Sequence, residues 1–181
     1  AARFREDALR LTKLLCDSTV AATPGTHALA ALMCLHLSRL PARLDEEGEL
    51  RTLFDQDRSL WDGALAAEGC RLLELSARGE ELSEYHVEAA IAAVHARARS
   101  MEDTDWRLIV GLYDTLLALR PSPVIALSRA IALAQHAGPA AGIEAIEAIE
   151  DRERLAQYPF FFAALGELEQ RRGRHAAAAV H

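Results

Sequence analysis

The sequence predicts an all-α fold, and three features of the chain carry that prediction. Of its 181 residues 51% are hydrophobic but only 6% are aromatic, so alanine and leucine supply most of the apolar surface. Both are strong helix formers, whereas the β-branched and aromatic residues typical of strands are sparse. Apolar residues recur at helical spacing, and proline and glycine turns separate the periodic stretches. A chain of this length can bury a substantial core in one large or two small domains.

The first part of the chain, residues 1–82, is predicted to hold a helical hairpin, an insertion and a third helix. Leucines spaced among polar residues predict an amphipathic helix over residues 4–16. A second helix over residues 27–40 is apolar almost all round, which predicts a central position. The insertion, residues 42–56, is expected to be either a short β-hairpin or an irregular loop. The third helix is expected to begin between Asp57 and Leu60 and to run to residue 76.

The second part, residues 83–181, is predicted to form helical pairs that continue the first part as one structural unit. Six helices are expected: Ser83–Arg99, Trp106–Leu119, Val124–Gln135, Pro139–Ile149, Phe160–Arg171 and His175–His181. Ile109, Tyr113, Leu116 and Pro121 have the offsets of the second helix in a tetratricopeptide repeat. Such helix pairs stack into a right-handed array with a concave groove, which is typical of binding proteins. The alternative is a generic helical bundle whose loops happen to recur.

The next helix of the repeat carries Leu127, Ala130 and Ile131 at its packing positions and Gly138 at the turn that follows. About 35 residues later the same offsets recur at Phe162, Leu165, Gly166 and Gly173. The last predicted helix is short and apolar, so we expect it either to fray or to pack on a second copy over Phe162 and Leu165. A homodimer is therefore one expected outcome.

The charge and the residue inventory argue against several classes of function. A net charge of −7 and a pI near 5.5 oppose direct binding to nucleic acid. No apolar stretch is long enough to span a membrane. Three widely spaced cysteines without a CxxC pair indicate reduced thiols and a cytoplasmic protein. The seven histidines lack the spacing of metal ligands, so we expect neither a metal nor a cofactor.

The densest polar segment is Phe54–Asp62, which contains the candidate site residues Asp55, Gln56, Asp57, Arg58 and Trp61. One interpretation is a structural network in which Asp57 caps the third helix and Arg58 pairs with an acidic neighbour. The other is a docking surface for another protein domain. Two carboxylates could serve acid–base chemistry, but no nucleophile, phosphate loop or metal set accompanies them, so we expect no enzyme activity.

The same segment resembles the C-terminal extension of a bacterial group of extracytoplasmic-function sigma factors, an extension built from tetratricopeptide-like helical pairs. Four other stretches resemble it in order and spacing, so that the likeness covers nearly the whole chain: Tyr85–Ala96, Thr104–Trp106, Leu112–Asp114 and Pro121–Val124, the last followed by Arg129 and Ala130. His86, Glu88 and Ser128 depart from the usual residues of that family.

The resemblance implies that the parent protein directs RNA polymerase to promoters in transcription initiation. This chain would then be its non-catalytic regulatory or interaction domain. The implied partners are the DNA-binding domains of the same sigma factor, the RNA polymerase core, or both, and a protein or peptide in the concave groove is a further candidate. The alternative is a stand-alone tetratricopeptide-like adaptor that binds proteins or peptides.

Overall fold

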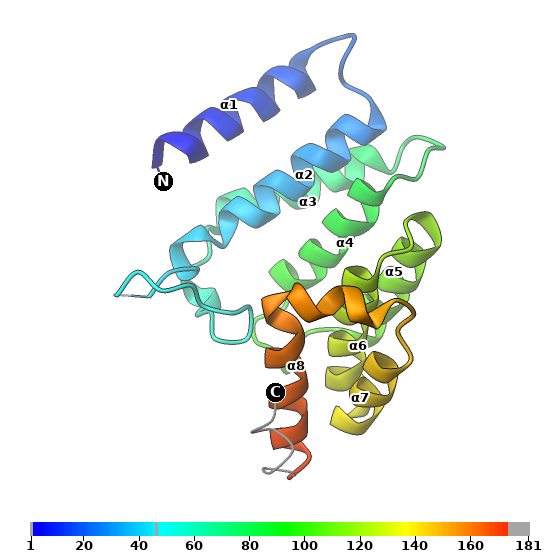
Figure 1. The fold of residues 1–181 in the computed structure, drawn as a ribbon. Helices are drawn as coiled ribbons and strands as arrows, with labels where there is room; N and C mark the ends of the chain where they lie inside the picture. Colours follow the sequence, from blue (N-terminus) through cyan, green and yellow to red (C-terminus); the bar gives the residue numbers. More distant parts are fainter. Residues whose placement is uncertain (1, 46, 174–181) are drawn as a thin grey trace. The chain divides into compact units, whose positions relative to one another are not determined.

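The structure is a computed structural model that describes residues 2–45 and 47–173. Within these ranges the chain is helical and contains no strand, which confirms the predicted fold class. The α-helices are α1 (Ala2–Asp17), α2 (Pro24–Ser38), α3 (Gly63–Ser76), α4 (Glu84–Arg97), α5 (Trp106–Leu119), α6 (Pro123–Ala137), α7 (Pro139–Glu147) and α8 (Pro159–Arg171). Three short 3-10 helices join them: η1 (Leu40–Ala42), η2 (Arg58–Leu60) and η3 (Arg152–Gln157). Figure 1 shows the order of these elements along the chain.

The contacts divide the chain into two compact units, Ala1–Asp105 and Trp106–His181. The sequence suggested a change after residue 82, but α4 packs against α2 and α3 and therefore belongs to the first unit. The described residues contain no helix that is long and apolar enough to cross a membrane.

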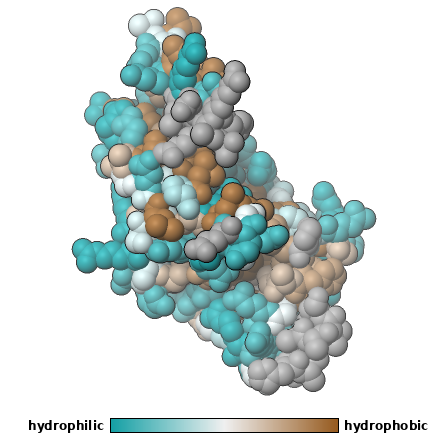
Figure 2. Space-filling model, turned by 90° about the vertical axis from the view of Figure 1, so that its left-hand side faces the viewer, coloured by the Kyte–Doolittle hydropathy of each residue, from teal (hydrophilic) through white to brown (hydrophobic). Residues whose placement is uncertain are grey.

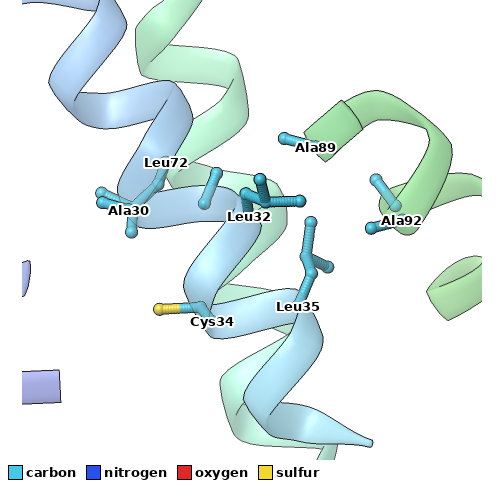
Figure 3. Close-up of a cluster of buried hydrophobic side chains, with 9 residues drawn as sticks. Ala30, Leu32, Cys34, Leu35, Leu72, Ala89 and Ala92 are labelled. Carbon is cyan, nitrogen blue, oxygen red and sulfur yellow. The ribbon is translucent and has the colours of Figure 1, made fainter. Parts of the chain in front are cut away.

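In the first unit α2 is the central helix, as its all-round apolar character predicts, and it contacts α1, α3 and α4 (Figure 1). It begins earlier than predicted because Thr23 caps it and Pro24 suits the first helical position. Figure 3 shows Leu32 of α2 pointing toward Ala89 and Ala92 of α4. The core thus joins leucines on the central helix to alanines on its neighbour.

A glycine sets the distance between α2 and α3. A Cβ atom on Gly69 would lie 2.6 Å from Leu35 Cγ and 3.1 Å from the carbonyl oxygen of Ala31. No side chain fits there without a shift of α2 or of Leu35, which is itself 1% exposed. Gly69 therefore allows the close packing of these two helices.

The insertion is an irregular loop. Leu44 and Leu50 form an isolated antiparallel bridge, and the Arg51 amide donates to the Arg43 carbonyl oxygen at 2.9 Å. Gly48, with a φ of 85°, makes the turn between them. One bridge does not make a strand, so the hairpin alternative was wrong for the described residues of this segment, and the irregular alternative holds.

The second unit contains α5 to α8, and each of these helices packs against the next along the chain. A Cβ on Gly142 of α7 would lie 2.4 Å from the Cβ of Ala134, so glycine again permits a close approach, here to α6. The sequence did not predict η3, which follows Asp151 in the left-handed conformation. The helix predicted over residues 175–181 lies outside the described residues.

Three leucines of α1 and a valine in the turn that follows it are exposed, which the predicted amphipathic packing did not anticipate. Leu11, Leu14 and Leu15 are 60%, 57% and 44% exposed, and Val20 is 89% exposed. On the face of the molecule drawn in Figure 2, brown hydrophobic residues lie among teal hydrophilic ones in the centre and the upper half.

Candidate functional site

The Phe54–Asp62 segment divides its side chains between the interior of the first unit and solvent. Gln56 is 8% exposed, and Arg58 and Trp61 are half-buried. Asp55 and Asp57 are exposed, and so is Leu60 at 54%. The structural-network interpretation therefore concerns the inner residues, and the docking interpretation concerns the exposed ones.

Arg58 connects η2 to the end of α4 and to the connection that follows it. Its Nη1 donates to the carbonyl oxygens of His95 and Ala98, both at 3.0 Å, and its Nη2 donates to the Thr104 hydroxyl at 3.1 Å. Nη2 also contacts the sulfur of Met101. The last carbonyl groups of a helix lack partners within the helix, so Arg58 supplies donors where α4 needs them.

The expected partner of Arg58 was wrong in kind. Its hydrogen-bond acceptors are two backbone carbonyls, a hydroxyl and a thioether, and none is a carboxylate. Burial lowers the pKa of the Arg58 guanidinium, while the more distant Glu102 and Asp103 act in the opposite direction. Arginine suits this position because its planar fork reaches several fixed acceptors at once.

Trp61 lies against two guanidinium groups. The Cζ atoms of Arg39 and Arg58 are each 5.3 Å from the centroid of the indole ring. This distance is within the range of cation–π attraction, which is strongest for tryptophan. The buried Nε1 of Trp61 has no hydrogen-bond partner among the described residues. The contacts of Trp61 with charged groups are therefore made by the face of its ring. Trp61 is thus part of the network.

Gln56 completes the inner face of the segment. Its Oε1 accepts from Arg39 Nε at 3.2 Å, and its Nε2 donates to the Arg51 carbonyl oxygen at 3.2 Å. Burial, Arg43 and Arg58 lower the pKa of Arg39 to about 10, so Arg39 remains charged at neutral pH. The amide of Gln56 therefore ties the end of α2 to the insertion.

The aspartates of the segment act locally. Asp57 does not cap α3 as predicted: its side chain accepts from the Ser59 amide at 2.9 Å and so caps the short η2. The cap of α3 is Asp62, whose Oδ1 accepts from the Leu65 amide at 3.0 Å. Asp55 accepts from the Thr52 hydroxyl. The prediction failed because a 3-10 turn and a separate helix start share one acidic segment.

His95 is a member of the site that sequence reasoning missed. It is 6% exposed, and burial, Arg58 and Arg39 lower the pKa of its imidazole to about 4. The imidazole stays neutral at physiological pH for two reasons. Its protonated form would lose its hydration on burial, and it would be repelled by the positive charges of Arg58 and Arg39. The only signal in the sequence was the resemblance of Tyr85–Ala96 as a whole.

The histidines and acidic residues of the segment and of α4 do not form a cluster of metal ligands within the described residues. Within residues 2–45 and 47–173, no group of three His, Cys, Asp or Glu side chains is placed to hold a metal ion. His86, the other buried histidine of α4, accepts from the Ser83 amide through Nδ1 at 3.2 Å and supports the start of that helix. The contacts of this region hold α2, η2 and α4 in position.

Comparison with known proteins finds a family model that matches part of the chain. Residues 1–77 match the model of a family of unknown function, DUF6596, and this range includes the whole Phe54–Asp62 segment. Over 169 residues the chain is 38% identical to an uncharacterized protein of Rhizobium meliloti (strain 1021). The alignment covers 93% of this chain, so both units are shared. The chain spans only 39% of the length of that relative. No solved structure matches.

Proposed function

We propose that this chain is a non-catalytic regulatory and interaction domain of an extracytoplasmic-function sigma factor, whose parent protein directs RNA polymerase to promoters. The observation that carries the proposal is the division of the Phe54–Asp62 segment, where the resemblance to that family is strongest. Its inner side chains, Gln56, Arg58 and Trp61, bind the first unit together, while Asp55, Asp57 and Leu60 face solvent. A rigid inner network supports a fixed outer surface for a partner.

The outer surface favours a protein partner. It combines two carboxylates with an exposed leucine, and the insertion adds Leu44 and Leu50, which are 51% and 68% exposed. Exposed apolar groups beside charges are typical of docking surfaces between domains. The partners we propose are the DNA-binding domains of the same sigma factor and the RNA polymerase core, which places the chain in the cytoplasm.

We further propose a tetratricopeptide-like arrangement of the helical pairs. In the second unit α5, α6, α7 and α8 each pack on their neighbour in sequence, and α6 also contacts α8. Contacts between alternate helices are expected when hairpins stack, and this pattern supports an array that offers a groove to a peptide. The R. meliloti relative leaves well over half of its length outside the alignment, which is room for DNA-binding domains in a protein of that kind.

The test is promoter-dependent transcription with the natural reading frame. Purified bacterial core RNA polymerase would be combined with three proteins. These are the parent protein encoded by the natural reading frame, the parent protein from which the 181 residues of this chain are deleted, and the parent protein with the double substitution Asp55→Ala/Leu60→Ala. We expect the deletion and the double variant to change transcript yield in the same direction, because the deletion removes the docking surface and the double variant removes two of its side chains. The matched control is Glu80→Ala, an exposed carboxylate in the turn after α3.

Stability must be measured beside activity, since a variant that unfolds gives the same loss. The double variant should keep the urea midpoint of the unmodified protein, because neither side chain is buried. A reading frame without sigma-factor domains, or transcription unaffected by both the deletion and the double variant, contradicts the proposal. The first of these outcomes would favour a stand-alone adaptor that binds peptides.

A further inference from the structure

A cavity of about 350 Å³ lies between α1, α2 and α3 of the first unit, apart from the Phe54–Asp62 segment. This volume is at the small end of the range of ligand pockets in proteins. The most buried part of its lining is formed by Cys34, Leu72 and Thr12, which are 2%, 3% and 5% exposed, and the half-buried Cys16 and Leu65 adjoin it. Figure 3 shows the Cys34 sulfur pointing to the side of α2 that faces away from α4.

Small side chains of α1 line the inner part of the cavity. Thr12 and Cys16, four residues apart on one face of α1, line the cavity, while Leu11, Leu14 and Leu15 are exposed. Burial of leucine is the main gain available to an amphipathic helix, and these three leucines leave that gain unused. A larger side chain at position 12 or 16 would fill the space. The helix is therefore placed to enclose a cavity and is not packed for maximal burial.

The inner surface is uncharged. Burial raises the pKa of Cys34 to about 11 and also raises the pKa of Cys16, so both thiols stay protonated at neutral pH. A protonated thiol behaves as a small apolar group. Together with the two leucines, the thiols provide a surface for the apolar body of a ligand.

The outer part of the lining is charged, and it has unused donors. Arg71 donates from Nε and Nη2 to the two oxygens of Glu68, both at 2.7 Å, which leaves Nη1 without a partner among the described residues. Lys13, on the α1 side, has no ion-pair partner among the described residues. The two carboxylates of the lining are Glu68, which is paired with Arg71, and Asp17, so the lining carries no net charge. Its unpaired donors among the described residues are Lys13 and Nη1 of Arg71.

We propose that this cavity binds a small amphiphilic anion, with its apolar body against Cys16, Cys34 and Leu72 and its anionic group between Lys13 and Arg71. This site is separate from the docking surface and does not depend on the function proposed above. The lining defines this class of ligand. The small apolar cavity requires a short apolar body, and the donors of Lys13 and Arg71 require one anionic acceptor group.

The experiment uses the full chain and three probes with the same apolar body, namely octanoate, octylamine and octanol. Isothermal titration calorimetry at neutral pH measures the affinity of each. We expect saturable binding of octanoate, with octylamine weaker by about tenfold or more because Lys13 and Arg71 oppose a cation. Bound octanoate should also slow the reaction of Cys16 with a thiol reagent.

The variants locate the binding. Cys16→Leu fills the cavity from α1 and should abolish binding of octanoate, while Lys13→Ala should weaken it by about tenfold without a change in packing. Cys70→Ala is the matched control, because Cys70 packs against the same core but does not line the cavity. Absence of saturable octanoate binding, unchanged binding in Cys16→Leu, or equal affinity for octylamine would each overturn the proposal.

Discussion

Arg58 donates a 3.0 Å hydrogen bond to the backbone carbonyl oxygen of His95, thirty-seven positions along the chain. The bond fixes the end of α4 to the segment that precedes α3. It also places a guanidinium group beside the buried His95 imidazole, whose pKa it helps to lower. Stability and pH dependence of the first unit are therefore linked through one arginine.

Replacing Arg58 by alanine should destabilise the protein by roughly 2 kcal/mol, because several buried acceptors lose a charged donor at once. Arg58→Lys should recover only part of this, since an ammonium group cannot reach acceptors on both sides of a planar fork. Urea denaturation measures both. Arg97→Ala is the control: its side chain is 61% exposed and its contact with Glu74 is 3.9 Å long. Equal midpoints for all three variants would contradict a structural role for Arg58.

The two aspartates that start adjacent elements should differ in their effect on stability. Asp62→Ala removes the cap of a helix of 14 residues and should cost about 1 kcal/mol. Asp57→Ala affects only the exposed 3-10 turn and should have the smaller effect. Thermal melts of both variants, at one pH above 7, compare them. A larger loss for Asp57→Ala would mean that Asp57 has a partner outside η2.

Stability should fall as the pH is lowered below about 6.5, the ordinary pKa of histidine. In this range the unfolded chain binds a proton at His95, whereas the folded protein, with a pKa of about 4, does not. The difference favours unfolding by about 1.4 kcal/mol for each pH unit, or about 2 kcal/mol at pH 5. Urea midpoints from pH 7.5 to pH 5 give the slope.

The variant His95→Gln isolates this contribution, because it keeps the backbone carbonyl that Arg58 uses and removes the titrating group. Its slope over the same pH range should be clearly flatter. His36, whose pKa is also lowered, contributes to the slope of both proteins and cancels in the comparison. Identical slopes would show that the His95 imidazole is not held neutral by Arg39 and Arg58.

Two glycines of the second unit should respond to alanine with opposite signs. Gly142→Ala places a Cβ 2.4 Å from that of Ala134 and should destabilise by about 1–3 kcal/mol through overpacking. Gly111 has open space around its Cβ position within α5, so Gly111→Ala should stabilise by up to about 1 kcal/mol. Differential scanning calorimetry resolves the sign of each. Stabilisation by Gly142→Ala would show that α6 and α7 are less closely packed.

The helices could be predicted from the sequence because each is set by local residues. The predicted Trp106–Leu119 has the same bounds as α5, since an acidic linker and Pro121 limit it on either side. The 3-10 turn at Arg152–Gln157 was not predicted, because its conformation depends on Leu155 being buried in the core of the second unit. A single buried leucine among charged residues has no helical period.

The partners of the candidate site could be predicted only in part. The composition of the segment indicated a polar network, and Gln56, Arg58 and Trp61 do form one. The acceptors of Arg58 could not be read from the sequence, because backbone carbonyls are present at every position. Tertiary contact alone selects those of His95 and Ala98.

The insertion is attached at both ends, with a consequence for protein engineering. Arg39, before the insertion, donates a hydrogen bond to Gln56 at the end of the insertion. The Asp62 amide donates to the Ser38 carbonyl oxygen at 2.8 Å. The helices beyond these anchors do not depend on the length of the tip around Gly48. Because the entropy of closing a loop grows only slowly with its length, the tip is a suitable place to graft a fluorescent reporter or an epitope. Such a label would sit beside the proposed docking surface and could report a partner's arrival there.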